Sequence, residues 1–442
     1  MEKQQSIYDV VGIGIGPFNL GLAALLEKTP ELNAVFFEKK QEFNWHEGML
    51  LEGTTLQVPF FADLVSMADV TSPYSYLNYL QQHDRLYHFY FLEKFLIPRK
   101  EYNDYCRWAA HQLDSCRFGK AVEAVEYIGD QDEPCYQISV RDAQTQKIDV
   151  YYSRHIVMGI GSAPAVPSAF SPYMGESILH SADYLRNKEN VLKKKSVTVV
   201  GSGQSAAEVF LDLLNEQEEY GYQLNWYTRS KGFFPMEYSK LGLEYFTPDY
   251  LDFFYRLPQE KKDEILPKQD LLYKGISATT IAAIFDKMYE KSIGNAELSI
   301  ELRAMTEVAA VTPAENGWRL KCRQWVEDSE FDVDTEAIVF GTGYKSTLPA
   351  FLETMEDHLV RDDLGRLAIT KDYRVGTAIS TPNHLFIQNG EMHTHGVGAP
   401  DLGLGAFRNS IIINQLAGKE VYPSEPKGAF QSFRVKSPVM AY

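Results

Sequence analysis

The chain has 442 residues, 45% of them hydrophobic and 13% aromatic, which is too long for one ordinary core and enough for two or three packed domains. Its 43 basic and 60 acidic residues give a net charge of −17, and beyond a short lysine run at 193–195 no basic block could hold a nucleic-acid backbone. The first residues lack a cationic and apolar leader, and no apolar run approaches the ~18 residues of a membrane span, so we expect a soluble cytoplasmic protein without nucleic-acid or membrane partners.

The first predicted element is the strand IYDVVGIG, which leads into a glycine turn and an Ala/Leu-rich helix. Gly14 allows the tight turn, and Gly16, followed by Pro17, lets the backbone approach a pyrophosphate at the helix N-terminus. Asn19 stands where the third glycine of such a turn is usual, so the packing of helix on strand must accommodate a small polar side chain. The next strand ends at Glu38, near the ~20-residue offset of an acid that binds a ribose hydroxyl. This order predicts a dinucleotide site; an ordinary βαβ turn is the alternative.

A second strand, turn and helix follow in KSVTVVGSGQSAAEVFLDLL. The strand after that helix ends in a cation and a hydroxyl rather than an acid, which suits a 2′-phosphate and favours NADPH over NADH. Alternatively, Arg229 and Lys231 are solvated loop charges. The residues expected to bind this second dinucleotide are Gly201, Gly203, Gln204, Ser205, Arg229 and Ser230.

A third buried strand, EAIVF, ends in the glycine turn GTGYK, which contains Gly343 and Tyr344 and can return the chain to the first nucleotide domain. Two dinucleotide sites with opposite ribose preferences indicate an FAD and an NADPH that reduces it. The predicted fold class is therefore α/β, with two Rossmann-like dinucleotide-binding domains.

The cysteines show no sign of redox or metal chemistry, because they form no C-x-x-C pair and have no metal-ligand spacing. We expect buried, unreactive thiols, which excludes a disulfide reductase. The four are Cys106, Cys116, Cys135 and Cys322.

Nine blocks along the chain together resemble the flavin-dependent N-hydroxylating monooxygenases of siderophore biosynthesis, which act on lysine, ornithine or diamines. The blocks are GIGPFNL, FNWHEGM, LQVPF…DLVS, TSPYSYLNYL, YNDYCRWAA, VVGSGQSAAE, EYFTPDY, FGTGY and HTHGV, and the similarity extends from about residue 7 to about residue 415. The resemblance implies FAD and NADPH domains, a small helical substrate region and often a homotetramer. We expect the FAD domain at 1–165 and 335–442, the NADPH domain at 166–240 and 295–334, and the helical region at 241–294.

The resemblance also implies a reaction. NADPH reduces FAD, oxygen adds to give a C4a-hydroperoxyflavin, and the terminal amine of the substrate attacks the distal oxygen. The site must therefore be dry and must present a neutral amine, and an apolar wall can lower the amine pKa by desolvation.

Several further site residues are implied by the resemblance. Trp45 and His46 match a block beside the flavin ring, and Gln57 matches a catalytic glutamine near its reactive edge. The alternatives are core packing for Trp45, a structural role for His46 and backbone bonding for Gln57. The late block HTHGVGAPDLGLGAF implies a segment over the flavin that includes Gly396, Asp401 and Leu402. Within it His393 and His395 lack a third ligand, so we expect no metal.

The wall LQVPFFADLVS carries no cation. In the amino-acid hydroxylases of the family a lysine that pairs with the substrate carboxylate typically stands at Ala62, and in ornithine hydroxylases an asparagine stands at Leu243. A carboxylate would lose its partner here, whereas a diamine has none to satisfy and would be repelled by a lysine. We therefore expect putrescine or cadaverine as substrate, with Ala62, Leu243 and Lys274 at its site.

The substrate's second ammonium should meet an anion, for which Asp63, Glu237 and Glu244 are unranked candidates. Alternatively, Lys240 or Lys274 binds a carboxylate from another place and the substrate is L-lysine or L-ornithine. Other flavin monooxygenases and a non-enzymatic NADP sensor are further alternatives. Ser277 could equally cap a helix.

Overall fold

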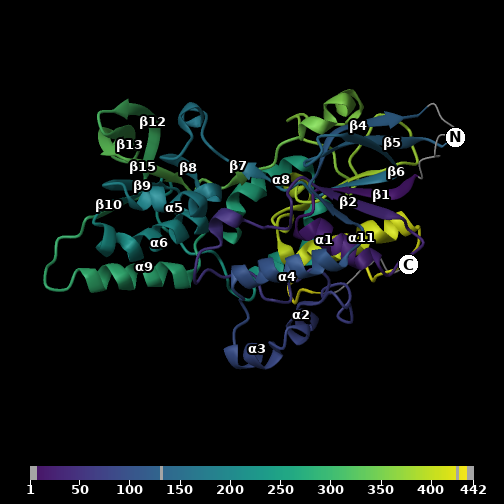
Figure 1. Cartoon of the computed structure of the whole chain (residues 1–442), viewed down its shortest axis with the longest axis horizontal. Coiled ribbons are helices and arrows are strands. Elements are labelled where there is room, and N and C mark those ends of the chain that lie inside the picture. The colour runs from purple at the N-terminus through teal and green to yellow at the C-terminus, as the bar shows by residue number, and fades with distance from the viewer. Residues whose placement is uncertain (1–6, 130–132, 425–427, 436–442) are drawn as a thin grey trace.

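The computed structural model describes residues 7–129, 133–424 and 428–435, and its two main sheets lie at opposite ends of an elongated molecule (Figure 1). The ends of the predicted FAD domain, 1–6 and 436–442, lie outside these residues. Each sheet contains one of the glycine turns found in the sequence, so the prediction of two Rossmann-like domains is confirmed.

The first sheet has the order β3-β2-β1-β6-β5-β4, with β17 also beside β6. Its central strands are parallel, whereas β4 and β5 form an antiparallel extension. α1 (Pro17–Leu26) and α11 (Gly405–Ala417) pack together beneath it, and α4 (Arg99–Gln112) lies beside them (Figure 1). The strands are β1 (Tyr8–Ile13), β2 (Ala34–Glu38), β3 (Cys116–Phe118), β4 (Lys120–Ile128), β5 (Cys135–Asp142), β6 (Ile148–Met158) and β17 (Leu385–Ile387).

The second sheet is wholly parallel, in the order β11-β10-β9-β15-β8. Its strands are β8 (Ile178–His180), β9 (Ser196–Val200), β10 (Gln223–Tyr227), β11 (Ile300–Arg303) and β15 (Ala337–Phe340). Around it lie α5 (Tyr184–Leu192), α6 (Gln204–Tyr220) and a small antiparallel sheet of β12 (Thr306–Ala314), β13 (Gly317–Gln324) and β14 (Ser329–Thr335). Because β15 pairs with β8 and β9, the domain boundary predicted at residue 335 falls one strand too early.

The two domains are joined by a short antiparallel ribbon of β7 (Ala163–Pro164) and β16 (Tyr344–Lys345), through which the chain leaves and re-enters the first domain. The short helices η1 (Glu47–Met49), from the first domain, and η3 (Ser181–Asp183), from the second, also pack together. Gly48 is required there, because a Cβ at this position would lie 2.0 Å from the carbonyl oxygen of Ala182.

The predicted helical region is divided between the two domains. α7 (Pro248–Tyr255) and α8 (Gln259–Ile265) pack against α10 (Met392–His395), while α9 (Ala278–Lys291) packs against α6. Ile284 of α9 lies in the core of the second domain. The remaining helices are η4 (Gly242–Phe246), η5 (Leu266–Leu272), η2 (Ser171–Tyr173), η6 (Ala350–His358), η7 (Leu402–Leu404), α2 (Tyr76–Gln82) and α3 (Leu86–Leu92).

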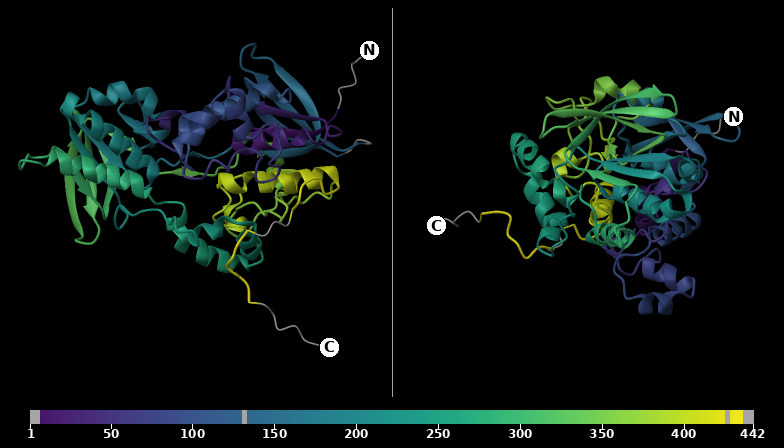
Figure 2. Two further views of the ribbon diagram at one scale, coloured as in Figure 1. Left: turned by 90° about the horizontal axis from the view of Figure 1, so that it is seen from below. Right: turned by 90° about the vertical axis from the view of Figure 1, so that its left-hand side faces the viewer.

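Two surface features complete the fold, the helix α3 and the chain after α11. α3 projects from the body and has no buried residue; its Tyr87, Tyr90 and Phe91 are each more than 70% exposed (Figure 1). After α11 the chain runs past the helices of 242–272 (Figure 2).

All four cysteines are free and buried, as predicted. Within the described ranges, no helix has the length and apolar character to span a membrane.

Candidate functional site

The first glycine turn has the shape that a dinucleotide requires. Gly14 has φ of +83°, and a Cβ there would lie 2.7 Å from the carbonyl oxygen of Gly159. Gly16 caps α1 and Pro17 is its first residue, so free N–H groups point out of the helix start. The backbone N–H of Ile15 donates to Oε2 of Glu38 at 2.9 Å, which places the predicted ribose acid directly beside the turn.

Asn19 is fully buried, and its side chain bonds to protein groups. Its Nδ2 lies 2.8 Å from the carbonyl oxygen of Gly14 and 3.2 Å from that of Val157, and its Oδ1 accepts from Gln388 at 2.8 Å. The Asn19 side chain therefore braces the turn against β6 and the end of β17, and a contact of this residue with the cofactor stays a prediction.

The second turn is equally tight. Gly201 has φ of +144°, and a Cβ there would lie 2.2 Å from the carbonyl oxygen of Gly341. Gly203 caps α6, and Ser205 lies in the first turn of the helix. Ser230 lies beside the turn, because its hydroxyl is 2.8 Å from that of Ser202. Arg229 is exposed and is the neighbour of Ser230 in the chain, so a hydroxyl lies beside this turn with a cation next to it in sequence.

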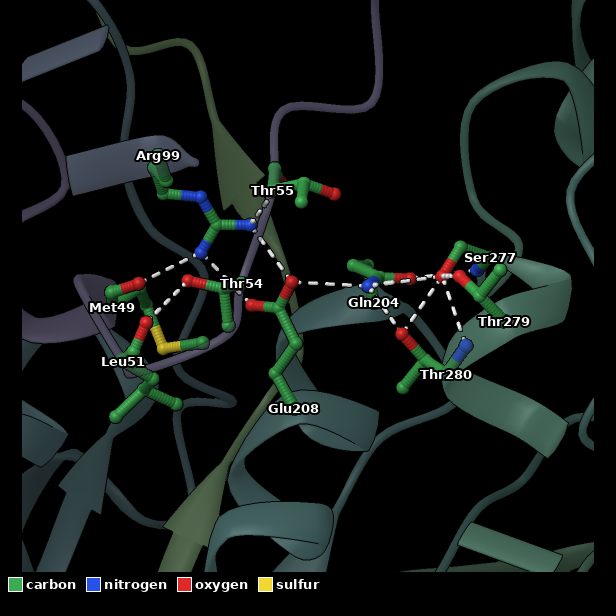
Figure 3. Close-up of polar contacts among 10 residues, drawn as sticks. All are labelled: Met49, Leu51, Thr54, Thr55, Arg99, Gln204, Glu208, Ser277, Thr279 and Thr280. Atoms are coloured by element: carbon green, nitrogen blue, oxygen red, sulfur yellow. Dashed lines mark hydrogen bonds and ion pairs between the residues drawn. The ribbon is translucent and has the colours of Figure 1, made fainter. Parts of the chain in front are cut away.

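The side chain of Gln204, which was predicted to bind the cofactor, bonds to three protein groups. Its Nε2 donates to Glu208 Oε1 and to Thr280 Oγ1, each at 3.0 Å, and its Oε1 accepts from the backbone N–H of Ser277 at 2.7 Å (Figure 3). Ser277 caps α9 through its contact with the Thr280 N–H, so the capping alternative is confirmed. The Gln204 side chain thus ties α6 to the start of α9.

A row of three rings crosses the junction between the domains. The ring of His46 lies 5.4 Å from that of Tyr344, which lies 5.2 Å from the ring of His180. Burial, with the charges of Arg99 and Lys40, lowers the pKa of His46 to about 4, and burial raises that of Tyr344. His46 is therefore neutral at pH 7, and this row of rings adds no charge to the junction.

Two neighbours of this row were predicted to bind a cofactor. The carbonyl oxygen of Gly343 lies 3.1 Å from His180 Nε2. This contact helps to hold the backbone where the chain returns to the first domain. Trp45 packs against the first core and lies 5.3 Å, ring to ring, from Tyr102. This contact fits the core-packing alternative for Trp45.

Gln57 presents a polar group that the described residues leave unsatisfied. Its Nε2 is buried without a hydrogen-bond partner, although burying such a donor costs about 1–3 kcal/mol. Its backbone carbonyl accepts from the hydroxyl of Tyr238. A buried donor of this kind fits an acceptor edge of a bound cofactor or substrate.

The late segment, residues 393–407, lies beside the first glycine turn. Leu402 and Pro17 line the same small hollow, so residues from the two ends of the chain meet there. Asp401 caps η7 by accepting from Gly403 N–H at 2.8 Å, and desolvation raises its pKa to about 6. Gly396, with φ of +82°, ends α10 and packs against Phe254.

The three residues predicted at the substrate site differ in burial and in what surrounds them. Ala62 is 5% exposed and faces the late segment, because a Cβ at Gly403 would lie 3.9 Å from its own. Leu243 is 37% exposed on η4. Lys274 is exposed, with its Nζ 5.2 Å from the centre of the Tyr273 ring. The structure thus gives each of these three side chains a separate surrounding.

Two candidate partners of the remote ammonium are already engaged. Asp63 accepts from the N–H groups of Val65, Ser66 and Tyr76 and from the Ser66 hydroxyl, and burial raises its pKa. Glu244 accepts from the N–H groups of Phe430 and Gln431, each at 2.9 Å. Glu237 is exposed and accepts from Ser239 N–H, so it is the candidate with the most free acceptor capacity.

The histidines of the late segment bind backbone carbonyls. His393 Nε2 lies 2.8 Å from the Leu367 carbonyl oxygen, and the His395 ring stacks on Tyr373 at 4.5 Å. Among the residues that the structure describes, no cluster of His, Cys, Asp or Glu could hold a metal ion. A cavity of about 500 Å³ at the far ends of α6 and α9 is distant from both glycine turns.

Sequence reasoning missed three residues at the domain junction. Arg99 and Glu208 form a buried ion pair across it, and Tyr238 holds the Gln57 carbonyl. The pairing of Arg99 with Glu208 has no local signal in the sequence, because 109 positions separate the two residues.

Two glycine turns, one on a mixed sheet and one on a wholly parallel sheet, each leading into a helix, are the architecture of a two-dinucleotide flavoprotein oxidoreductase. Residues 6–346 match the family described as L-lysine 6-monooxygenase/L-ornithine 5-monooxygenase, and the chain belongs to this family. It is a flavin-dependent N-hydroxylating monooxygenase.

Three proteins are similar to this chain along nearly its whole length. The rhizobactin siderophore biosynthesis protein RhbE of Rhizobium meliloti is 47% identical, over 97% of this chain and 96% of the relative. The putrescine N-hydroxylase of Shewanella oneidensis is 44% identical, over 98% of this chain and 85% of the relative. The crystal structure of DfoA bound to FAD, the cadaverine monooxygenase of the desferrioxamine pathway of Erwinia amylovora, has a TM-score of 0.93 at 43% identity and covers 98% of this chain and 99% of DfoA.

Proposed function

We propose that the protein hydroxylates one primary amine of an aliphatic diamine, putrescine or cadaverine, in the biosynthesis of a hydroxamate siderophore. The assignment of a diamine as substrate rests on Ala62, which is buried against the segment 393–407. It offers no charge at the position where amino-acid hydroxylases of the family typically have a lysine. The activities named for the Shewanella and Erwinia relatives support the same class.

The residues present fit FAD at the first turn and NADPH at the second. Gly14, Gly16 and Glu38 would hold the FAD pyrophosphate and ribose, and Gly203, Arg229 and Ser230 would hold NADPH. The reduced flavin, with oxygen, supplies the oxygen atom that the amine receives.

The chain's own residues prepare the amine. An alkylammonium has a pKa of ~10.4, so presenting it neutral at pH 7 costs about 4.6 kcal/mol, a cost that desolvation by an apolar wall can offset. The neutral His46 ring and the buried Tyr344 ring add no charge of their own near the junction. Gln57 Nε2 is the donor available to an acceptor on the cofactor or substrate.

The deciding experiment measures hydroxylamine formation with FAD and NADPH, comparing putrescine, cadaverine, L-lysine and L-ornithine at equal concentration. Product from the diamines alone supports the proposal. Product mainly from lysine or ornithine would show that another cation, such as Lys240 or Lys274, binds the carboxylate.

We further propose a homo-oligomer, a tetramer by family resemblance, that covers the aromatic face of α3, and a cytoplasmic location with access to NADPH. Tyr87, Tyr90 and Phe91 are large, exposed and adjacent, a composition typical of subunit interfaces. Light scattering of the wild type and a Tyr90→Ser/Phe91→Ser variant tests the assembly, because a monomeric wild type would exclude it.

A further inference from the structure

The most deeply buried ion pair between the two domains joins Arg99 at the start of α4 to Glu208 in α6. The two are bidentate, with Nη1–Oε2 and Nη2–Oε1 distances of 2.8 Å each. Arg99 is 9% exposed and Glu208 is 5% exposed. Figure 3 shows the pair at the centre of a continuous set of polar contacts.

On one side the pair holds the segment that leads to Gln57. Arg99 Nη1 also donates to the Met49 carbonyl oxygen at 2.8 Å. Met49 and Leu51 are packed in the core of the second domain, whereas Leu56, one residue before Gln57, is packed in the core of the first. Arg99 therefore holds the segment 49–56, which crosses from the core of the second domain to that of the first just before Gln57.

On the other side the pair holds the second glycine turn. Glu208 Oε1 accepts from Gln204, the first residue of α6 after Gly203, and Gln204 in turn accepts from the Ser277 N–H that starts α9. A displacement of the Glu208 carboxylate would therefore move both the turn and the loop that precedes α9.

The pair is not needed merely to keep the domains attached. The β7–β16 ribbon, the contact of η1 with η3 and the ion pair of Glu47 with Arg186 also join them. A buried ion pair contributes little net stability compared with apolar residues of the same volume, but its fixed bidentate geometry can specify an orientation.

We propose that Arg99 and Glu208 are positioning residues that set the NADPH turn against the segment bearing Gln57, so that hydride delivery depends on them while FAD binding and the reaction of reduced flavin with oxygen do not. The inference rests on the proposed binding of NADPH at the second turn.

The test compares wild-type holoenzyme with Glu208→Gln, which keeps the shape and removes the charge, and Glu208→Asp, which keeps the charge and shortens the reach. Asp334→Asn is the matched control, because Asp334 makes a bidentate pair with Arg319 on the exposed β13–β14 face. Four quantities are measured: FAD content, the rate of flavin reduction at saturating NADPH, the rate of reoxidation after chemical reduction, and hydrogen exchange at 47–57 and 201–208.

We expect Glu208→Gln to slow reduction by NADPH at least tenfold and to increase exchange in both segments, with FAD content and reoxidation unchanged and with Asp334→Asn like the wild type. Glu208→Asp should be intermediate, and it decides the matter if Glu208→Gln does not fold. Reduction at the wild-type rate in the folded Glu208 variants would overturn the inference, as would loss confined to FAD content or reoxidation. Failure of NADPH to reduce the wild type would instead reject the proposed function.

Discussion

The hydroxyl of Tyr238, in the loop after β10 of the second domain, donates to the backbone carbonyl of Gln57 in the first domain. The carbonyl of Gln57 is thereby held, while its side-chain Nε2 has no partner among the described residues. Two domains thus jointly place one free donor at the candidate site.

Replacing Tyr238 with phenylalanine should disturb that placement. The Gln57 carbonyl would lose its donor at a cost of about 1–2 kcal/mol, which we expect as a roughly 5- to 30-fold fall in kcat/KM for the amine. Steady-state hydroxylamine assays check this. Tyr289→Phe is the control because Tyr289 is 67% exposed, and an equal loss in both variants would contradict a role for the Gln57 contact.

Ala62→Lys should weaken the use of diamines. A lysine would bring a like charge toward the second ammonium, and we expect kcat/KM for putrescine and cadaverine to fall roughly 10- to 150-fold, or about 1.5–3 kcal/mol. Ala62→Met adds similar bulk at this 5%-exposed position without charge. If the methionine variant loses as much activity as the lysine variant, bulk and not charge explains the loss.

Glu237 and Glu244 should respond differently to loss of charge. Glu237→Gln should raise KM for the diamine roughly 10- to 150-fold, because a charge-assisted contact contributes about 1.5–3 kcal/mol. Glu244→Gln should leave KM for the diamine unchanged. It should speed proteolytic cleavage of the chain that follows Tyr422, because Glu244 accepts from the N–H groups of Phe430 and Gln431. The opposite pattern of KM values would assign the ammonium to Glu244.

Arg229→Ala should change the choice of nicotinamide cofactor. Losing one charge-assisted contact to a 2′-phosphate should raise KM for NADPH roughly 10- to 150-fold, or about 1.5–3 kcal/mol. KM for NADH should stay the same, since NADH has no such phosphate, and it is the internal control. Equal KM changes for NADPH and NADH would show that exposed Arg229 is a solvated charge.

Asp401 should make unfolding stability depend on pH in an identifiable window. Desolvation raises its pKa from 3.8 to about 6, so the folded state binds a proton that the unfolded state releases between these values. Stability from this group is therefore present below pH 3.8 and is lost as pH rises to 6, by up to about 3 kcal/mol. Urea unfolding of the wild type and Asp401→Asn at several pH values should show the Asn variant gaining relative stability over this range. Parallel pH curves for the two proteins would exclude this linkage.

The cofactor turns were predictable because each is a local pattern. A strand, two glycines and a helix start lie within about twenty residues, and the steric need for glycine is visible in the letters themselves. Gly14 and Gly201 accordingly lie where a Cβ would meet a carbonyl oxygen. The family and its chemistry followed from the same local blocks.

Side-chain direction was not predictable within those blocks. Asn19 and Gln204 stand in the correct turns, yet each turns its amide to protein groups 73 or more positions away. Asp63 and Glu244 could not be ranked as anions for a similar reason, because Tyr76 and Phe430, whose backbone N–H groups they accept from, lie 13 and 186 positions away.

The sequence by itself determined the α/β class, the two glycine turns and the family of this protein, since short-range sterics and helix-start geometry are encoded in consecutive residues. Only the tertiary structure decided that β15 belongs to the second sheet, that α9 packs on α6, and that Arg99 meets Glu208. These pairings depend on how residues distant in the chain pack and share buried charge, and no local pattern records that.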